Sequence, residues 1–144
     1  MKYPLNEGTL TIPDHWRDDS INVFTISETE GTNLVVSRQK VPAELSHSDY
    51  LNQQLDSFDE GLQGYKKLAK QNIEVDGATG VTVEYKFTSP EGVMHQLTTM
   101  LIKGQQFLSM TFTHPATMTD HQKEGFMSVV TQFTFDEQAV ADVH

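Results

Sequence analysis

Most strand-like segments of this chain are apolar on both faces. The clearest example runs from Val93 to Thr113. Alternate side chains of a strand point to opposite faces. In this segment one face carries Val93, Leu97 and Leu101, and the other face carries Met94, Met100 and Ile102. A sheet with one face in water would alternate apolar and polar residues instead. More of this chain or another molecule must cover the second face, which indicates binding rather than catalysis.

Seven segments have the alternation and composition that are typical of strands. They are Thr9–Ile12, Ile21–Ile26, Asn33–Arg38, Asn72–Val75, Gly80–Thr88, Val93–Ile102 and Phe107–Thr113. Short turns separate the later ones, at Pro90-Glu91-Gly92 and at Gly104. These turns predict hairpins between consecutive strands.

Two segments have helical periodicity instead. The first begins near Pro42, Ser46 or Ser48 and ends near Gln63, where Gly61 and Gly64 weaken it. Its apolar stripe consists of Leu51, Leu55, Phe58 and Leu62. The second helix begins near Thr119-Asp120, and its apolar face consists of Phe126, Val129, Val130 and Phe133.

The element order βββαββββα places hairpins before and after the first helix, and neither helix makes a regular crossover. This order predicts an α+β fold with a mainly antiparallel β-sheet flanked by two helices. The length of 144 residues favours a single domain over residues 1–144. We expect Trp16 and Phe133 to lie in its core.

Charge and composition exclude several classes of function. The net charge is -10, with 10 Lys and Arg against 20 Asp and Glu, which argues against binding to nucleic acid or to anionic membranes. The chain contains no cysteine, so it has no disulfide framework and no thiolate chemistry. We find no signal peptide and no run of about 20 apolar residues. We therefore expect a soluble, cytoplasmic protein without stable membrane association.

The sequence gives no positive support for an enzyme, a metal site or a cofactor. The six histidines lack the spacing of metal ligands, so we expect ordinary surface or turn residues. The segment Gly77 to Gly80 is too short to hold a phosphate, and a hairpin turn accounts for it. No nucleophile, nucleotide-binding or phosphate-binding motif is present.

Three polar residues interrupt the apolar faces. Gln54 lies between Leu51 and Phe58 on the helix stripe, Ser37 shares the face of Val35, and Thr99 lies between Leu97 and Leu101. One interpretation is that they lie at the edge of the core and bond to backbone or water. The other is a surface suited to an apolar helix, whose few polar groups such side chains would bond.

One segment carries a resemblance to a known family. The run from Ile12 to Phe24, Ile-Pro-Asp-His-Trp-Arg-Asp-Asp-Ser-Ile-Asn-Val-Phe, resembles the opening signature of the Eag chaperones of type VI secretion effectors, within the DcrB-related (DUF1795) group. Weaker matches follow at Val36-Ser37-Arg38, at Tyr50 with Gln54-Leu55, and from Gly77 to Tyr85. The similarity spans nearly the whole chain.

The resemblance implies a Mog1/PsbP-like fold, a homodimer, and a client. The client would be the N-terminal transmembrane helices of a secreted effector, often attached to a PAAR domain. The implied client groove consists of Ile21, Val23, Ser37, Gln54, Phe58, Leu62, Leu97, Thr99 and Leu101. The family usually has a small residue in place of Phe58 and a glutamine in place of Thr99. For each groove residue, ordinary core packing is the alternative.

Two other functions stay open at this point. The first is a Mog1-like adaptor that docks a folded partner through its sheet edge or loops and has no transmembrane client. The second is an enzyme or small-ligand binder that uses the same face. Binding that survives deletion of a client's apolar helices would favour the adaptor.

Overall fold

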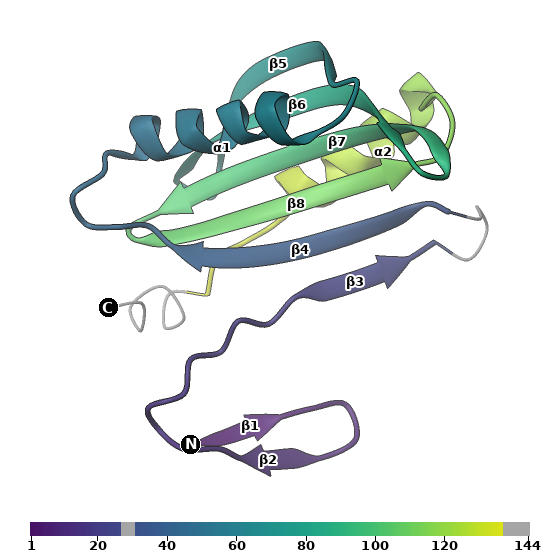
Figure 1. The fold of residues 1–144 in the computed structure, drawn as a ribbon. Coiled ribbons are helices and arrows are strands. Elements are labelled where there is room, and N and C mark those ends of the chain that lie inside the picture. Colours follow the sequence, from purple (N-terminus) through teal and green to yellow (C-terminus); the bar gives the residue numbers. More distant parts are fainter. Residues whose placement is uncertain (27–30, 137–144) are drawn as a thin grey trace.

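A six-stranded antiparallel sheet forms the body of the molecule, with one helix on each face (Figure 1). The computed structural model describes residues 1–26 and 31–136. The strands are β1 (Lys2–Pro4), β2 (Thr9–Thr11), β3 (Asn22–Thr25), β4 (Asn33–Lys40), β5 (Lys66–Val75), β6 (Ala78–Ser89), β7 (Gly92–Lys103) and β8 (Gln106–His114). The helices are α1 (His47–Gly61) and α2 (Asp120–Thr131). The order in the sheet is β3-β4-β8-β7-β6-β5, and β1 pairs with β2 separately.

A tight turn fixes the register of β5 against β6. Val75 pairs with Ala78 across the turn between β5 and β6. In that turn Asp76 and Gly77 have φ angles of 49° and 80°. A two-residue turn of this kind requires positive φ at both positions, which glycine adopts without strain. The hairpin expected around Gly77 is thus confirmed.

The helix α1 covers one face of the sheet, called here the α1 side. Ser46 caps this helix by accepting a hydrogen bond from the backbone N–H of Asp49 at 3.1 Å. Its buried residues Tyr50 and Leu51 pack with a cluster from β6, β7 and β8. That cluster contains Val81, Val83, Tyr85, Met100, Ile102 and Phe107.

The opposite face, called here the α2 side, is covered by α2. Thr119 and Gln122 form a reciprocal capping box at its start. Phe126 stacks on Phe112 with ring centroids 4.4 Å apart, and Val130 is fully buried. The other buried members of this cluster include Val75, Leu97, Leu101, Leu108 and Met110. The sheet is therefore apolar on both faces because each face carries its own helix.

The predicted α+β class and the antiparallel sheet with two helices are confirmed. The predicted and observed strands differ at β5 and β1. The sequence predicted Asn72–Val75, whereas β5 begins at Lys66. This strand lies at the edge of the sheet, and its first seven residues are exposed, so no apolar alternation marks them. β1 is an additional short strand that was not predicted.

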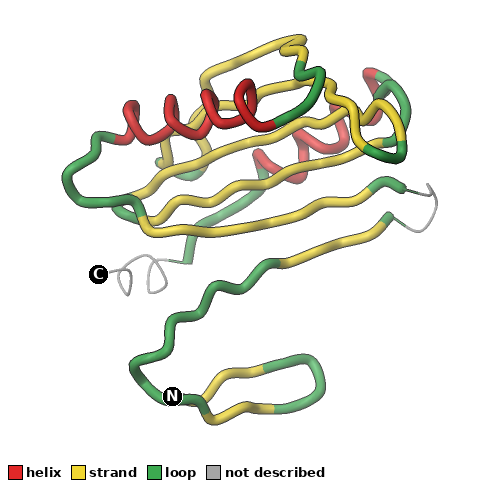
Figure 2. The backbone as a smooth tube through the Cα atoms, in the orientation of Figure 1, coloured by secondary structure: helices red, strands yellow, loops and turns green. Residues whose placement is uncertain are grey.

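The position predicted for Trp16 is wrong. Trp16 is 57% exposed and lies in the segment that joins the β1-β2 hairpin to β3. The hairpin lies apart from the six-stranded sheet, beyond β3, in Figures 1 and 2. Phe133 is partly buried against the α2-side core, as expected, with its ring 4.8 Å from that of Phe135.

Candidate functional site

The α1 side of the sheet is only partly covered. Figure 2 shows α1, in red, over the part of the sheet that contains β6, while β4 and β3 extend beyond it. Antiparallel pairing places side chains from β3, β4, β8 and β7 side by side on this exposed part. We call it the open face, and it consists of Val23, Val35, Ser37, Ser109, Thr111 and Gln96. All six are partly or fully exposed.

The open face has no charged side chain, and hydroxyl groups cross the strands below it. The Tyr85 hydroxyl lies 3.0 Å from that of Thr98, which lies 3.0 Å from that of Thr111. The Gln96 amide donates to the Thr113 hydroxyl at 2.8 Å. Each hydroxyl has a partner and keeps a further acceptor site. The open face is therefore uncharged and combines two valines with four side chains that can form hydrogen bonds.

The Tyr85 phenol is the one titratable group in this row, and burial favours its uncharged form. Desolvation raises the pKa of Tyr85 to about 12, although the hydrogen bond with Thr98 acts in the opposite direction. The phenol is therefore protonated at every physiological pH. It serves as a hydrogen-bonding group and not as a base.

The residues predicted on β3 and β4 reach this face. Val23 is 60% exposed and pairs with Val35, which in turn pairs with Thr111. Ser37 is half-buried and pairs with Ser109. Ile21 lies two residues before Val23 and is also exposed. The structure thus brings the first third of the predicted groove together.

The residues predicted on the helix lie at its boundary with the sheet. Gln54 is half-buried, one turn after Tyr50 and one turn before Phe58. The ring of Phe58 stacks on Tyr85 with centroids 5.2 Å apart, and Leu62 packs against the same cluster. Phe58 and Leu62 therefore belong partly to the α1-side core, the alternative that the sequence left open.

The residues predicted on β7 lie elsewhere. Thr99 pairs with Met110, and Leu97 and Leu101 pair with Phe112 and Leu108. The three belong to the α2 side, where their exposed fractions are 5% for Leu97, 1% for Thr99 and 0% for Leu101. Leu97, Thr99 and Leu101 cannot line a surface shared with Val23 and Ser37. The prediction was displaced by one residue, and a displacement of one residue exchanges the two faces of a strand.

The neighbours of these three residues face the open side. Thr98 is buried in the hydroxyl row and Gln96 is half-exposed. Sequence reasoning also missed Ser109 and Thr111. Their signal was available, because Ser109, Thr111 and Thr113 alternate strictly with Leu108, Met110 and Phe112 along β8. This is the pattern of a strand with one half-exposed face.

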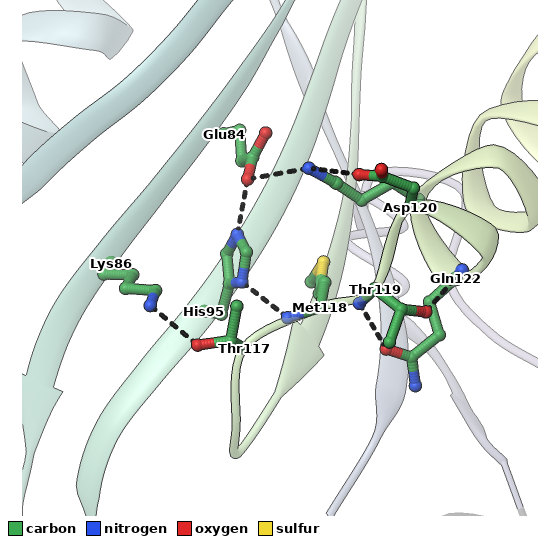
Figure 3. A network of polar contacts seen from close by, with 9 residues as sticks. Glu84, Lys86, His95, Thr117, Met118, Thr119, Asp120 and Gln122 are labelled. Carbon is green, nitrogen blue, oxygen red and sulfur yellow. Dashed lines mark hydrogen bonds and ion pairs between the residues drawn. The ribbon is translucent and has the colours of Figure 1, made fainter.

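A second polar cluster lies on the α2 side (Figure 3). His95 is 2% exposed; its Nε2 lies 2.7 Å from a carboxylate oxygen of Glu84, and its Nδ1 accepts the N–H of Met118 at 2.8 Å. An acceptor at Nδ1 places the proton of the neutral ring on Nε2. The ring thereby connects β6 and β7 to the segment that begins α2. The expectation of ordinary surface or turn histidines is wrong for His95 and for buried His114, which lies 2.7 Å from the Thr32 hydroxyl.

This cluster predicts a loss of stability in mild acid. Burial lowers the pKa of His95, although Glu84 favours the charged ring and raises it. The positive charges of Lys86 and Lys123 lower this pKa further. In the unfolded chain the ring of His95 takes up a proton near pH 6.5, whereas in the folded chain it resists protonation. The contribution of neutral His95 to the free energy of unfolding is therefore fully present above about pH 6.5 and decreases as the pH falls below it. Urea midpoints measured from pH 7.5 to pH 5.5 should decrease less in His95→Gln than in the wild type.

Exposed His121, on the first turn of α2, offers the matched control. The variant His121→Gln should keep the pH dependence of the wild type. Equal pH dependence in the wild type and in His95→Gln would show that this ring does not control the acid response.

Comparisons with known proteins agree with this architecture. The model of the DcrB family matches residues 7–132. The chain is 29% identical over 125 residues to a protein named Effector EagT6 from Pseudomonas aeruginosa strain PAO1, covering 83% of this chain and 86% of that protein. In the described residues, no helix is long and apolar enough to cross a bilayer.

Solved structures share the fold. The crystal structure of the protein PA94 from Pseudomonas aeruginosa superposes with a TM-score of 0.79 at 23% identity, covering 94% of this chain and 96% of that one. The solution structure of cyanobacterial PsbP (CyanoP) from Synechocystis sp. PCC 6803 gives a TM-score of 0.54 at 13% identity, with 88% and 99% covered. The PsbP-like fold implied by the resemblance is confirmed.

Proposed function

Since this chain belongs to the DcrB family, we propose that it is a cytoplasmic chaperone, and not an enzyme, for an effector of a type VI secretion system. Its similarity to the protein named Effector EagT6 supports the link to an effector. The resemblance of residues 12–24 to the Eag signature supports the role of a chaperone, working as a homodimer.

The client proposed for the open face is an apolar helix at the N-terminus of the effector, of the kind that spans a membrane after delivery. The observation that supports this is the composition of the open face. Valines supply apolar contact, while the amide of Gln96 and the hydroxyls of Ser37, Ser109 and Thr111 offer hydrogen bonds. A membrane helix carries mostly apolar side chains with a few small polar ones. The hydroxyl and amide groups of the open face can form hydrogen bonds with these small polar side chains.

The proposed client site therefore differs from the one expected from sequence. Ile21, Val23, Ser37 and Gln54 remain in it, and Phe58 and Leu62 form its boundary with the α1-side core. Gln96, Ser109 and Thr111 enter from β7 and β8, together with Val35 from β4.

The free energy available from such an interface is sufficient. A client helix that covers on the order of 1,000 Å² of apolar surface gains about 25 kcal/mol from burial at ~25 cal/mol per Å². Association and ordering offset much of this gain. The remainder can suppress aggregation of the client. One face of this kind can accept more than one helix sequence.

Co-expression with the effector tests the proposal. We expect the N-terminal segment of the effector to stay soluble and to copurify with this chain. Deleting only the apolar helices of that segment should abolish copurification. A complex that survives this deletion would instead identify an adaptor for a folded partner.

A further inference from the structure

A pocket of about 700 Å³ lies on the α2 side of the sheet, opposite the open face. Strands β3, β4 and β8 form its floor, and the end of α2 with residues 132–136 forms the facing wall. In Figure 1 this wall is the yellow segment that leaves α2 and passes behind β8 and β4. The pocket and the proposed client site are therefore separated by the thickness of the sheet.

One end of the pocket is apolar. On its floor Phe24 of β3 pairs with Leu34 of β4, and Val36 of β4 pairs with Met110 of β8. Phe24 on the floor and Val129 on the wall are 56% and 52% exposed. Two large apolar side chains that line one pocket and keep half of their surface exposed indicate a site for an apolar group.

The other end of the pocket carries a positive charge. Arg38 follows Leu34 and Val36 on the same face of β4, because side chains two residues apart in a strand share a face. The neutral amides of Asn22 and Gln106 line the pocket beside it. The pocket is therefore amphipathic along β4, apolar around Leu34 and cationic at Arg38.

Uncharged oxygens hold the guanidinium of Arg38 in place. It donates to the Ser20 carbonyl at 2.5 Å and to the side-chain oxygen of Asn22 at 2.7 Å. A guanidinium carries five N–H donors, so these two bonds leave donors for a ligand. A carboxylate is the anion that matches a guanidinium in shape and charge, because two parallel hydrogen bonds can join them.

Two carboxylates of the chain act on this end of the pocket. Asp18 accepts hydrogen bonds from the hydroxyl and the backbone N–H of Ser20, and the hydroxyl bond is the main cause of its lowered pKa. The charge of Arg38 lowers this pKa only as the smallest of several contributions. Asp136 lines the pocket itself. It would repel a bound anion, so its neutralisation should strengthen the binding of an anion.

The size of the pocket excludes a membrane helix as its occupant. Such a helix is about 10–12 Å across and about 30 Å long, which corresponds to on the order of 2,000–3,000 Å³. The observed volume of about 700 Å³ lies instead in the range of roughly 300–1,000 Å³ that is usual for small-molecule sites. The floor from Leu34 to Arg38 covers roughly 13 Å of strand. These dimensions fit a single short aliphatic chain.

We propose that this pocket binds a small single-chain amphiphile with a carboxylate head, of the chemical class of medium-chain fatty acids. The carboxylate pairs with Arg38, and the aliphatic chain lies along β4 toward Leu34 and Phe24. This inference goes beyond the proposed chaperone function and does not depend on it, because the open face stays accessible on the other side of the sheet.

Calorimetric titration of the full chain with decanoate, below its critical micelle concentration, tests the proposal. We expect saturable binding of one decanoate per chain. Burial of each further methylene group is worth about a fourfold gain in affinity, so affinity should increase in that ratio from octanoate to dodecanoate. Decanol and decyltrimethylammonium should bind at least tenfold more weakly than decanoate. Equal affinity for the three head groups, or no binding of decanoate at millimolar concentration, would overturn the proposal.

Charge variants test the role of Arg38. Arg38→Gln should weaken decanoate at least tenfold and leave the affinity for decanol unchanged, since glutamine keeps an amide donor for the Ser20 carbonyl. Arg17→Gln is the matched control, because Arg17 is exposed and pairs with Asp19 outside the pocket. Asp136→Asn should strengthen decanoate. Equal losses in Arg38→Gln and Arg17→Gln would show that net charge, and not the pocket, determines binding.

A variant that fills the pocket gives a second test, which does not depend on Arg38. Val129→Trp changes an exposed position of the wall and should abolish binding of decanoate and of decanol alike. His121→Trp, at an exposed position of α2 outside the pocket lining, should bind both like the wild type. Unchanged decanoate binding in Val129→Trp would place the ligand elsewhere and overturn the proposal.

Other occupants of the pocket give different results. Affinity for decanoate that decreases as the concentration of the chain increases would assign the pocket to a second copy. Binding that arises only after removal of residues 137–144 would assign it to the C-terminal segment of the chain. Decanoate that displaces the effector segment would lie on the open face. Each of these three results would overturn the proposal, whereas decanoate and effector segment bound together would support it.

Discussion

Leu97→Asp is expected to unfold the protein. Leu97 is buried on the α2 side in the cluster that contains Phe112 and Phe126. A carboxylate at this position would be buried without a partner and would leave the space of a leucine partly empty. Such changes cost more than about 4 kcal/mol, a large part of the total stability of a domain of this size. Circular dichroism during urea denaturation measures the loss.

Val93→Asp supplies the matched control. Val93 lies on the same strand and has the same side-chain direction as Leu97, but it is exposed. Its substitution should change stability by less than about 1 kcal/mol. A Leu97→Asp variant that stays folded and loses only client binding would contradict this expectation and support the groove predicted from sequence.

Val23→Asp is expected to have the opposite effect, with the fold intact and the client lost. Because Val23 is exposed on the open face, the isolated chain can accommodate a carboxylate there. Against an apolar helix the same carboxylate would lose its water without gaining a partner, which costs several kcal/mol. Since 1.4 kcal/mol is a factor of ten in affinity, recovery of the effector segment should decrease at least tenfold.

Leu68→Asp is the comparable change on the opposite edge of the sheet. Leu68 is an exposed apolar residue of β5, so the surface charge changes equally while the open face stays intact. This variant should retain the client at the level of the wild type. Equal loss in Leu68→Asp and Val23→Asp would indicate that net charge, and not the open face, controls binding.

The elements of the fold could be predicted because strands and helices leave different periods in the sequence. Strand-forming segments between turns identified the six strands of the main sheet, β5 only in its last residues, and the apolar faces of α1 and α2 identified both helices. A period of two shows which side chains of a strand share a face, but not which side of the sheet that face is on. Thr98 and Thr99 are adjacent threonines in a strand that is apolar on both sides, and only the pairing with β6 and β8 shows which one belongs to the α1 side.

The other errors have physical causes as well. The exposed Trp16 contradicts the general preference of tryptophan for burial, and a single sequence does not indicate that its segment lies apart from the six-stranded sheet. His95 resembled a surface residue because its partners Glu84 and Met118 are distant in sequence. The first seven residues of β5 are exposed because the edge strand contacts water there, so no buried apolar face marks them.

Protection of single cysteines tests the central claim most directly, namely that the client helix lies on the open face. Ser37→Cys and Ser109→Cys place a thiol there with little change in volume, and Ser128→Cys places one on the exposed surface of α2. Rates of alkylation are measured with and without the bound effector segment. We expect at least tenfold slower alkylation at positions 37 and 109 and an unchanged rate at position 128. Unchanged rates at 37 and 109 while the client remains bound would contradict it.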